Sequence, residues 1–254
     1  AKTLSYIGVL AASAGAAIAI KLGYPFVLLM SIIAIVISAF SIILVSSPKS
    51  HDSTHEKEYF SILKSGFRFI TKESLVLRLI IFVSVIHALG GAIDEFFPIF
   101  GDLTHIQKSG IAIFIGAMSA AEAIASFWAY KFEKLSARFF SILLMISGVL
   151  FYIAATMLNI SSLVLLVIFS GLYVINSVVI ESKIQHLIPS DTRATVSSLQ
   201  GFMVEVLVLI VYFGFGALAQ AYEYNGAFKI FGLVVIGFGL IYLLTSLFAR
   251  EKSA

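Results

Sequence analysis

The stretch "LVLRLIIFVSVIHALGGAIDEFFPI", residues 75–99, decides the fold because its 25 residues are almost all apolar. A helix that crosses a bilayer needs about 20 predominantly apolar residues, so this stretch is long enough to span the hydrocarbon. Two adjacent carboxylates, Asp94 and Glu95, lie near its end. A glycine pair precedes these acids and Pro98 follows them, which predicts a bend in this part of the helix.

Seven further stretches have the same character as residues 75–99. They run roughly over residues 4–20, 24–46, 109–130, 138–158, 161–183, 194–220 and 226–249. The chain is 60% hydrophobic and 12% charged, whereas soluble domains have about 45–50% apolar and about 25% charged residues. The sequence therefore predicts an all-α polytopic membrane protein with eight transmembrane helices. The absence of cysteine excludes disulfides and thiolate metal sites, and no metal site is expected elsewhere.

The connection over residues 47–74 is longer than the others and mixes polar and apolar residues. Phe60, Leu63, Phe67 and Ile70 recur at helical spacing, which predicts an amphipathic helix lying on the membrane surface. If this linker is cytoplasmic, 14 of the 17 Lys and Arg residues lie on its side of the membrane. The excess of positive charge predicts that both termini are also cytoplasmic.

Two segments hint at an internal repeat. "GAAIAIKLGYPF" (15–26) and "GALAQAYEYNGAF" (216–228) each contain a glycine-alanine pair, a second glycine and a phenylalanine that opens the next predicted helix. The two helical hairpins are therefore interpreted as related, although chance similarity between helices rich in small residues is an equal alternative.

Two helices, a long linker and six more helices resemble helices five to twelve of the major facilitator superfamily. "IPSDTRATVSSLQGF" (188–202) resembles the loop and start of the eleventh helix, and "AYKFEKLSARF" (129–139) is similar to the loop between helices eight and nine, without its glycines. "DEFFP" (94–98) resembles the outer end of helix seven in bacterial drug exporters. The resemblance implies a partial major facilitator fold that lacks the first four helices. Its parts would be two N-terminal-half helices (1–46), the cytoplasmic linker (47–74) and a six-helix C-terminal bundle (75–254).

The same resemblance implies a function. The protein would be a secondary active transporter in the cell membrane of a bacterium, moving a small molecule by alternating access, with proton-coupled export as the expected mode. Its partners would be the substrate, protons and the lipid bilayer. No enzymatic activity, cofactor or nucleic acid is expected. The sequence contains no P-loop lysine motif, which argues against transport driven by ATP. The alternative is a non-transporting membrane module, or an inactive fragment that needs a partner for the missing helices. An upstream reading frame with four more spans would favour the transporter.

Ionisable residues inside a span are expensive, from about 2.5 kcal/mol upward, so they mark candidate functional sites. Glu122 lies about 20 Å into its predicted span, and Glu205 lies about 18 Å from Arg193, both near mid-membrane. These two acids are the proton-coupling candidates. A structural hydrogen bond to a neighbouring helix is the alternative for Glu122.

Asp94 lies about 28 Å along its helix, close to the far edge of the hydrocarbon, so it and Glu95 are interpreted as an outer gate or entry site. Simple hydration at the interface is the alternative for these acids. The candidates for the substrate pathway and outer gate are His87, Asp94, Glu95, Ser119, Tyr173, Asn176 and Tyr212.

The candidates for an inner gate are Glu133, Arg138, Glu181 and Arg193. A salt bridge from Arg193 to an acid such as Glu181 or Glu133 would close the gate in one state and break in the other. The alternatives are ordinary positive-inside anchoring for Arg193 and snorkelling to the interface for Glu181.

Overall fold

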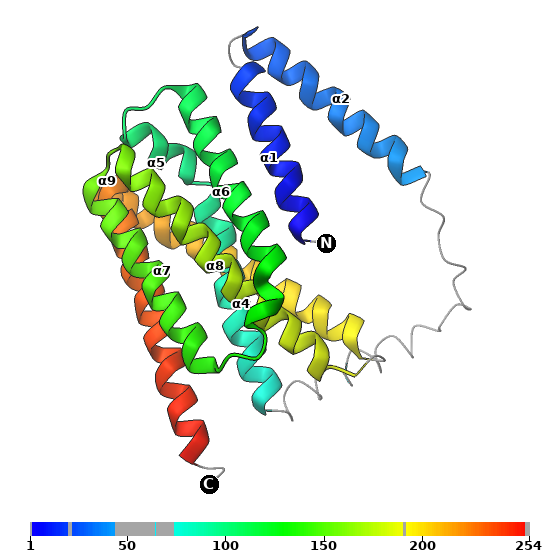
Figure 1. Cartoon of the computed structure of the whole chain (residues 1–254), viewed down its shortest axis with the longest axis vertical. Helices are drawn as coiled ribbons and strands as arrows, with labels where there is room; N and C mark the ends of the chain where they lie inside the picture. Colours follow the sequence, from blue (N-terminus) through cyan, green and yellow to red (C-terminus); the bar gives the residue numbers. More distant parts are fainter. Residues whose placement is uncertain (1, 20–21, 44–63, 65–73, 190–191, 252–254) are drawn as a thin grey trace.

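The computed structural model describes residues 2–19, 22–43, 64, 74–189 and 192–251, and every long element in these ranges is a helix (Figure 1). The predicted surface helix within residues 47–74 lies outside the described residues except for Lys64 and Ser74. The elements are α1 (Lys2–Ala19), α2 (Tyr24–Ile43), α4 (Ser74–Asp94), α5 (Phe97–Leu103), α6 (Lys108–Trp128), η2 (Ala129–Phe132), α7 (Ala137–Met157), α8 (Ile160–Leu187) and α9 (Arg193–Glu251).

The bend expected near Pro98 is confirmed. Helix α4 ends at Asp94, a turn follows, and α5 starts at Phe97 with Pro98 in its first turn. Proline has no backbone N–H and would clash with the carbonyl four residues earlier, so it is tolerated only where a helix begins. The predicted span 75–99 is therefore two helices, and the glycine pair before Asp94 stays inside the first of them.

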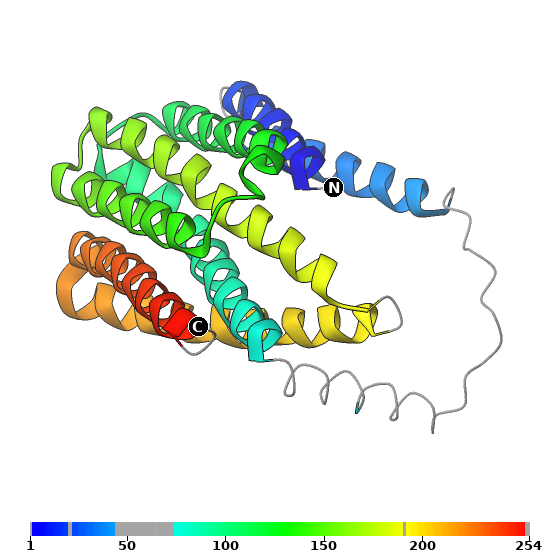
Figure 2. The same ribbon diagram turned by 60° about the horizontal axis from the view of Figure 1, so that its bottom comes forward.

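Helix α9 contains both of the last two predicted spans, 194–220 and 226–249. It is interrupted at Glu223, whose backbone is non-helical with φ 60° and ψ 170°. The chain reverses direction there, so the two arms of α9 run side by side (Figure 2). The rings of Phe215 and Phe228 pack across the reversal at 5.2 Å between centroids.

Six helices in the described part of the chain are long and apolar enough to cross a membrane. This number differs from the eight predicted spans for two reasons. Helix α9 counts once although it contains two arms, and the apolar stretch Thr3–Ala19 of α1 is shorter than the usual length of a span.

Helix α7 packs against the C-terminal arm of α9 through glycines. A Cβ atom on Gly232 would lie 2.9 Å from the backbone nitrogen of Tyr152, and one on Gly148 would lie 2.8 Å from that of Ile236. Small residues allow the backbones of membrane helices to approach closely. The α7–α9 seam is thus a tight, apolar part of the bundle.

Helix α1 packs along α6, as Figures 1 and 2 show. A Cβ on Gly116 would lie 3.2 Å from the Cβ of Ser13, and the hydroxyls of Thr3 and Ser126 are 3.1 Å apart. Helix α2 instead diverges from the bundle, and none of its span is buried. The position of α1 brings its Tyr6 to the polar face formed by α4, α6 and α8.

Candidate functional site

Two neighbouring cavities open beside the C-terminal half of α4. The first has a volume of about 80 Å³ and lies among α1, α4, α6 and α8, and the second has a volume of about 150 Å³ and lies among α1, α4, α5 and α6. Tyr6, Asp94 and Glu122 line both cavities. The fold therefore places two carboxylates and a phenol, from three different helices, around one polar space, which we call the acidic space.

Tyr173 fixes the wall of the acidic space between α4 and α8. Its hydroxyl donates a hydrogen bond of 2.6 Å to the carbonyl oxygen of Ile86. A Cβ on Gly90 would lie only 2.8 Å from the ring of Tyr173, so this position has room for glycine alone unless the ring moves. Tyr173 thus anchors α8 to α4 while its ring faces the first cavity.

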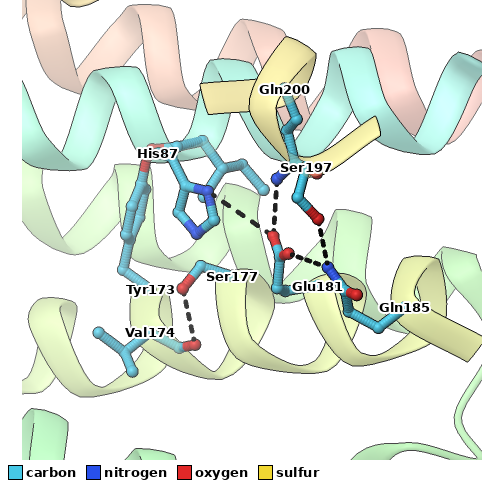
Figure 3. Close-up of polar contacts among 9 residues, drawn as sticks. His87, Tyr173, Val174, Ser177, Glu181, Gln185, Ser197 and Gln200 are labelled. Carbon is cyan, nitrogen blue, oxygen red and sulfur yellow. Dashed lines mark hydrogen bonds and ion pairs between the residues drawn. The ribbon is translucent and has the colours of Figure 1, made fainter. Parts of the chain in front are cut away.

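Glu181 is the centre of a polar network that joins three helices (Figure 3). Its carboxylate accepts a 2.8 Å hydrogen bond from Nε2 of Gln200 on α9 and a 3.1 Å bond from Nε2 of Gln185 on α8. The same Gln185 amide also lies 3.3 Å from Oγ of Ser197 on α9. On the other side, Nδ1 of His87 on α4 is 4.0 Å from Oε2 of Glu181. We call these residues the Glu181 network.

A third cavity, with a volume of about 320 Å³, adjoins the Glu181 network. It is lined by His87 on α4, by Glu181 on α8 and by the start of α9, including Gln200 and Glu205. His87 also lines the smaller cavity of the acidic space. This histidine consequently stands between the two acidic regions of the bundle.

A second polar cluster occupies the end of the bundle where α4 begins and α8 ends. Oε1 of Glu133 accepts a 3.2 Å hydrogen bond from Ser182 and lies 3.5 Å from Nε2 of His186. Lys183 reaches across from α8 and donates a 2.9 Å hydrogen bond to the carbonyl oxygen of Leu135. The loop after α6 is therefore tied to the end of α8 by several polar contacts.

The structure brings the predicted site residues together in unexpected combinations. Asp94 shares its cavities with Glu122, although the sequence suggested that the two acids had separate roles. His87, predicted with the outer residues, faces Glu181, which was predicted at an inner gate. Glu205 is exposed and lines the third cavity, away from Glu122.

The remaining predicted residues lie at the edges of these sites or inside the packing. Ser119 is buried and lines the cavity of about 150 Å³. Asn176 is fully buried, and its amide donates to the carbonyl oxygen of Leu172 within α8. Tyr212 packs at 6.0 Å from the ring of Phe96, and Glu95 is exposed in the turn after α4.

Among the described residues, Arg193 forms no salt bridge with Glu181 or Glu133 in this structure. Its Nη2 donates a 3.3 Å hydrogen bond to the carbonyl oxygen of Ile188, while the oxygens of Glu181 accept from the two glutamines. Asp191, another partner considered for Arg193, lies outside the described residues. Arg138 is exposed near the start of α7.

Sequence reasoning missed several residues of the acidic space and of the Glu181 network. They include Tyr6, Gln185, Ser197 and Gln200. The two glutamines are amides within or next to apolar helices, where polar groups need a partner, so their chemistry was a usable signal. Tyr6 gave no comparable signal, because its importance depends on the packing of α1 against α6.

Among the described residues, no group of three or more His, Cys, Asp or Glu side chains is placed to hold a metal ion. Comparison with known proteins matches the chain to a protein family. The family model described as Major Facilitator Superfamily matches residues 3–211. None of the curated proteins matches the chain.

Proposed function

The chain belongs to the Major Facilitator Superfamily, and we propose that it exports a small molecule in exchange for protons. Members of this superfamily are secondary transporters, not enzymes, and they move small molecules across the bilayer. The apolar helices and the family together make this chain a multi-pass membrane protein. Proton coupling, the direction of transport and the residues involved are the proposed part.

The acidic space is the observation that carries the proton-coupling proposal. Asp94 and Glu122 line the same two cavities, and Tyr6 lies beside both of them. Two carboxylates that share a confined site disfavour simultaneous ionisation, so one of them tends to hold a proton. Gain or loss of that proton changes the cost of closing the site away from water, and so shifts the balance between its open and closed states.

Glu205 is the second proton-coupling candidate, in a different place from Glu122. It lines the cavity of about 320 Å³ beside the Glu181 network. In the proposed mechanism the substrate enters this cavity and the acidic space takes up the proton. Ser119, Tyr173, Asn176 and Tyr212 would then belong to the walls and supports of the pathway.

The proposed arrangement in the membrane has eight crossings. Helix α1 and the two arms of α9 are counted as separate crossings, together with α2, α4, α6, α7 and α8. They would correspond to helices five to twelve of the superfamily fold, with the residue 47–74 linker and both termini in the cytoplasm of a bacterium. The proposed domains are residues 1–46, 47–74 and 75–254, and transport would occur as the bundle rocks against another half.

Two gates fit this arrangement. The outer gate would lie at Asp94 and Glu95, where the chain turns between α4 and α5. The inner gate would lie at the opposite end of α4 and α8, where Glu133 contacts Ser182 and His186. Arg138 and Arg193 lie near this end and would contact the acids in another state of the cycle.

The test uses membrane vesicles that contain the full-length protein and a panel of small organic molecules. A pH-sensitive dye inside the vesicles reports proton movement when a substrate is added to the outside. We expect substrate-dependent proton flux in the wild type and its loss in Glu122→Gln, because an amide cannot release a proton. Asp102→Asn, an exposed substitution on α5, serves as the matched control and should retain the flux.

Glu205→Gln is tested in the same vesicles. Undiminished flux in both Glu122→Gln and Glu205→Gln would contradict the proton-coupling proposal. A complete absence of substrate movement by the wild type would favour a non-transporting membrane module instead.

A further inference from the structure

His87 occupies a position that the proposed function has not yet used. It lies on α4 seven residues before Asp94, which is about 10 Å along a helix. Its ring lines the smaller cavity of the acidic space and also the cavity of the Glu181 network. In Figure 3 the ring lies above α8, with Nδ1 directed at the Glu181 carboxylate.

The titratable groups near His87 come from five helices, α1, α4, α6, α8 and α9. Through the two cavities that it lines, the titratable groups that face it are Tyr6 on α1, Asp94 on α4, Glu122 on α6, Tyr173 and Glu181 on α8, and Glu205 on α9. The environment contains four carboxylates and no other cationic side chain among these described lining residues. Acids therefore lie on both sides of His87, so a proton carried by its ring could pass to either group of acids.

The separation between His87 and Asp94 determines how a proton could pass between their side chains. About 10 Å along the helix separates His87 from Asp94, so direct transfer between their side chains is excluded without a carrier. The connecting cavity has a volume of about 80 Å³, well above the roughly 10–15 Å³ that one water molecule needs. The cavity is also polar at both ends, so water can connect the acidic space to the imidazole.

We propose that His87 is a proton relay between the Asp94–Glu122 acidic space and Glu181. This inference rests on the proposed proton-coupled function and adds a route to it. In the first step the O–H bond of Asp94 or Glu122 breaks, a water transfers the proton, and an N–H bond forms at Nε2 of His87. In the second step the Nδ1–H bond breaks and an O–H bond forms on Glu181, which leaves the imidazole neutral.

The Glu181 network explains how the relay would affect the helices. The 4.0 Å between Nδ1 and Oε2 is longer than a hydrogen bond, which spans about 2.7–3.2 Å. Protonation of His87 would draw the two side chains together, whereas protonation of Glu181 would weaken the bonds that it accepts from Gln185 and Gln200. Because Gln200 is on α9, the position of the proton would be sensed by the contact between α8 and α9.

The first experiment measures His87 directly. Full-length protein with ¹⁵N-labelled histidine is placed in lipid nanodiscs, and the His87 signal is assigned by its loss in His87→Gln and followed by NMR from acid to alkaline pH. We expect Glu181→Gln to lower the pH midpoint of His87 by about one unit or more, because it removes the nearest opposite charge. Asp102→Asn should leave the midpoint unchanged, and the exposed His105 provides an internal reference. An unchanged midpoint in Glu181→Gln would overturn the relay.

The second experiment separates a relay from a structural role. In the vesicle assay we expect His87→Gln to reduce substrate-dependent proton flux at least tenfold, while the thermal unfolding midpoint of the purified variant stays at the wild-type value. Flux at the wild-type level in His87→Gln would overturn the relay but leave proton coupling intact. No proton flux in the wild type would reject the proposed function itself, and the relay with it.

Discussion

The two sides of this helical bundle are built in opposite ways. Along the α7–α9 seam, glycines bring the backbones together and phenylalanine rings fill the space, as where Phe151 packs 5.0 Å from Phe231. On the polar face between α4, α6 and α8, cavities separate the helices and carboxylates line them. Among the described residues, Ser84 and Asn176 of this region each have a buried oxygen with no hydrogen-bond partner.

The difference in packing indicates which part of the bundle is rigid and which part can change conformation. Dispersion contacts in a dry seam are lost with only a small separation of the helices, so the α7–α9 pair should move as one body. A polar face with cavities loses less when its helices shift, because water and alternative hydrogen bonds can replace its contacts. We therefore expect conformational change on the polar face and preserved packing at the seam.

The largest predicted effect on stability comes from a substitution that disrupts the α7–α9 seam. Gly232→Ala would place a Cβ 2.9 Å from the backbone nitrogen of Tyr152, and because backbone cannot rotate away, α7 and α9 must separate. We expect a loss of about 3 kcal/mol in unfolding free energy, at the upper end of overpacking effects. Thermal or denaturant unfolding in nanodiscs measures this loss. Gly237→Ala on the same arm, where nothing lies within 4 Å of the new Cβ, should be almost neutral.

The second prediction concerns the close contact between α4 and α8 at the wall of the acidic space. Gly90→Ala would place a Cβ 2.8 Å from the Tyr173 ring, which is a side chain and can yield partly. We expect a loss of about 2 kcal/mol and a weakened hydrogen bond from Tyr173 to Ile86. The neighbouring Gly91→Ala, whose Cβ meets nothing within 4 Å, is the control. Equal stability of the two variants would show that the ring is not confined.

The third prediction tests the Glu181 network, which continues the polar side of the bundle from α8 to α9. Gln200→Met keeps a similar volume but removes the 2.8 Å hydrogen bond to Glu181. Hydrogen bonds to charged groups contribute about 1.5–3 kcal/mol to stability. The substitution also removes the buried Oε1 of Gln200, which has no hydrogen-bond partner, and this offsets part of the loss. We therefore expect the unfolding free energy to fall by about 1.5 kcal/mol. Gln220→Met, an exposed position on the same helix, should change stability little. A more stable Gln200→Met variant would contradict the network.

The smallest predicted effect lies outside both regions and stabilises the protein. Glu223 has φ 60° and ψ 170°, a backbone conformation that only glycine adopts without strain, and such strain costs about 1–3 kcal/mol. We expect Glu223→Gly to raise the unfolding free energy by about 1 kcal/mol, measured in the same unfolding assay. Tyr224→Gly, one residue later at an ordinary backbone conformation, should lower it. A destabilised Glu223→Gly variant would argue against strain at the reversal.

The structure also sharpens what could be predicted about the site. Glu122 and Glu205 were selected because a charge in an apolar helix requires a partner or a water-filled cavity, and that argument needs no neighbouring helix. Their partners could not be predicted, because helical periodicity gives the face of a side chain but not which helix covers that face. His87 and Glu181 are separated by 94 positions in the sequence, and Tyr6 and Asp94 by 88 positions. Only the packing of the helices brings the members of each pair together.

The sequence by itself determined that this chain is a helical membrane protein, because runs of about 20 apolar residues are stable only across a bilayer or in a core. It also determined the break at Pro98, a local consequence of proline chemistry. Only the tertiary structure decided that Asp94 joins Glu122 and that His87 stands between two acidic regions. The physical reason is that charge and hydropathy are properties of single residues, whereas a shared cavity arises from the packing of several helices.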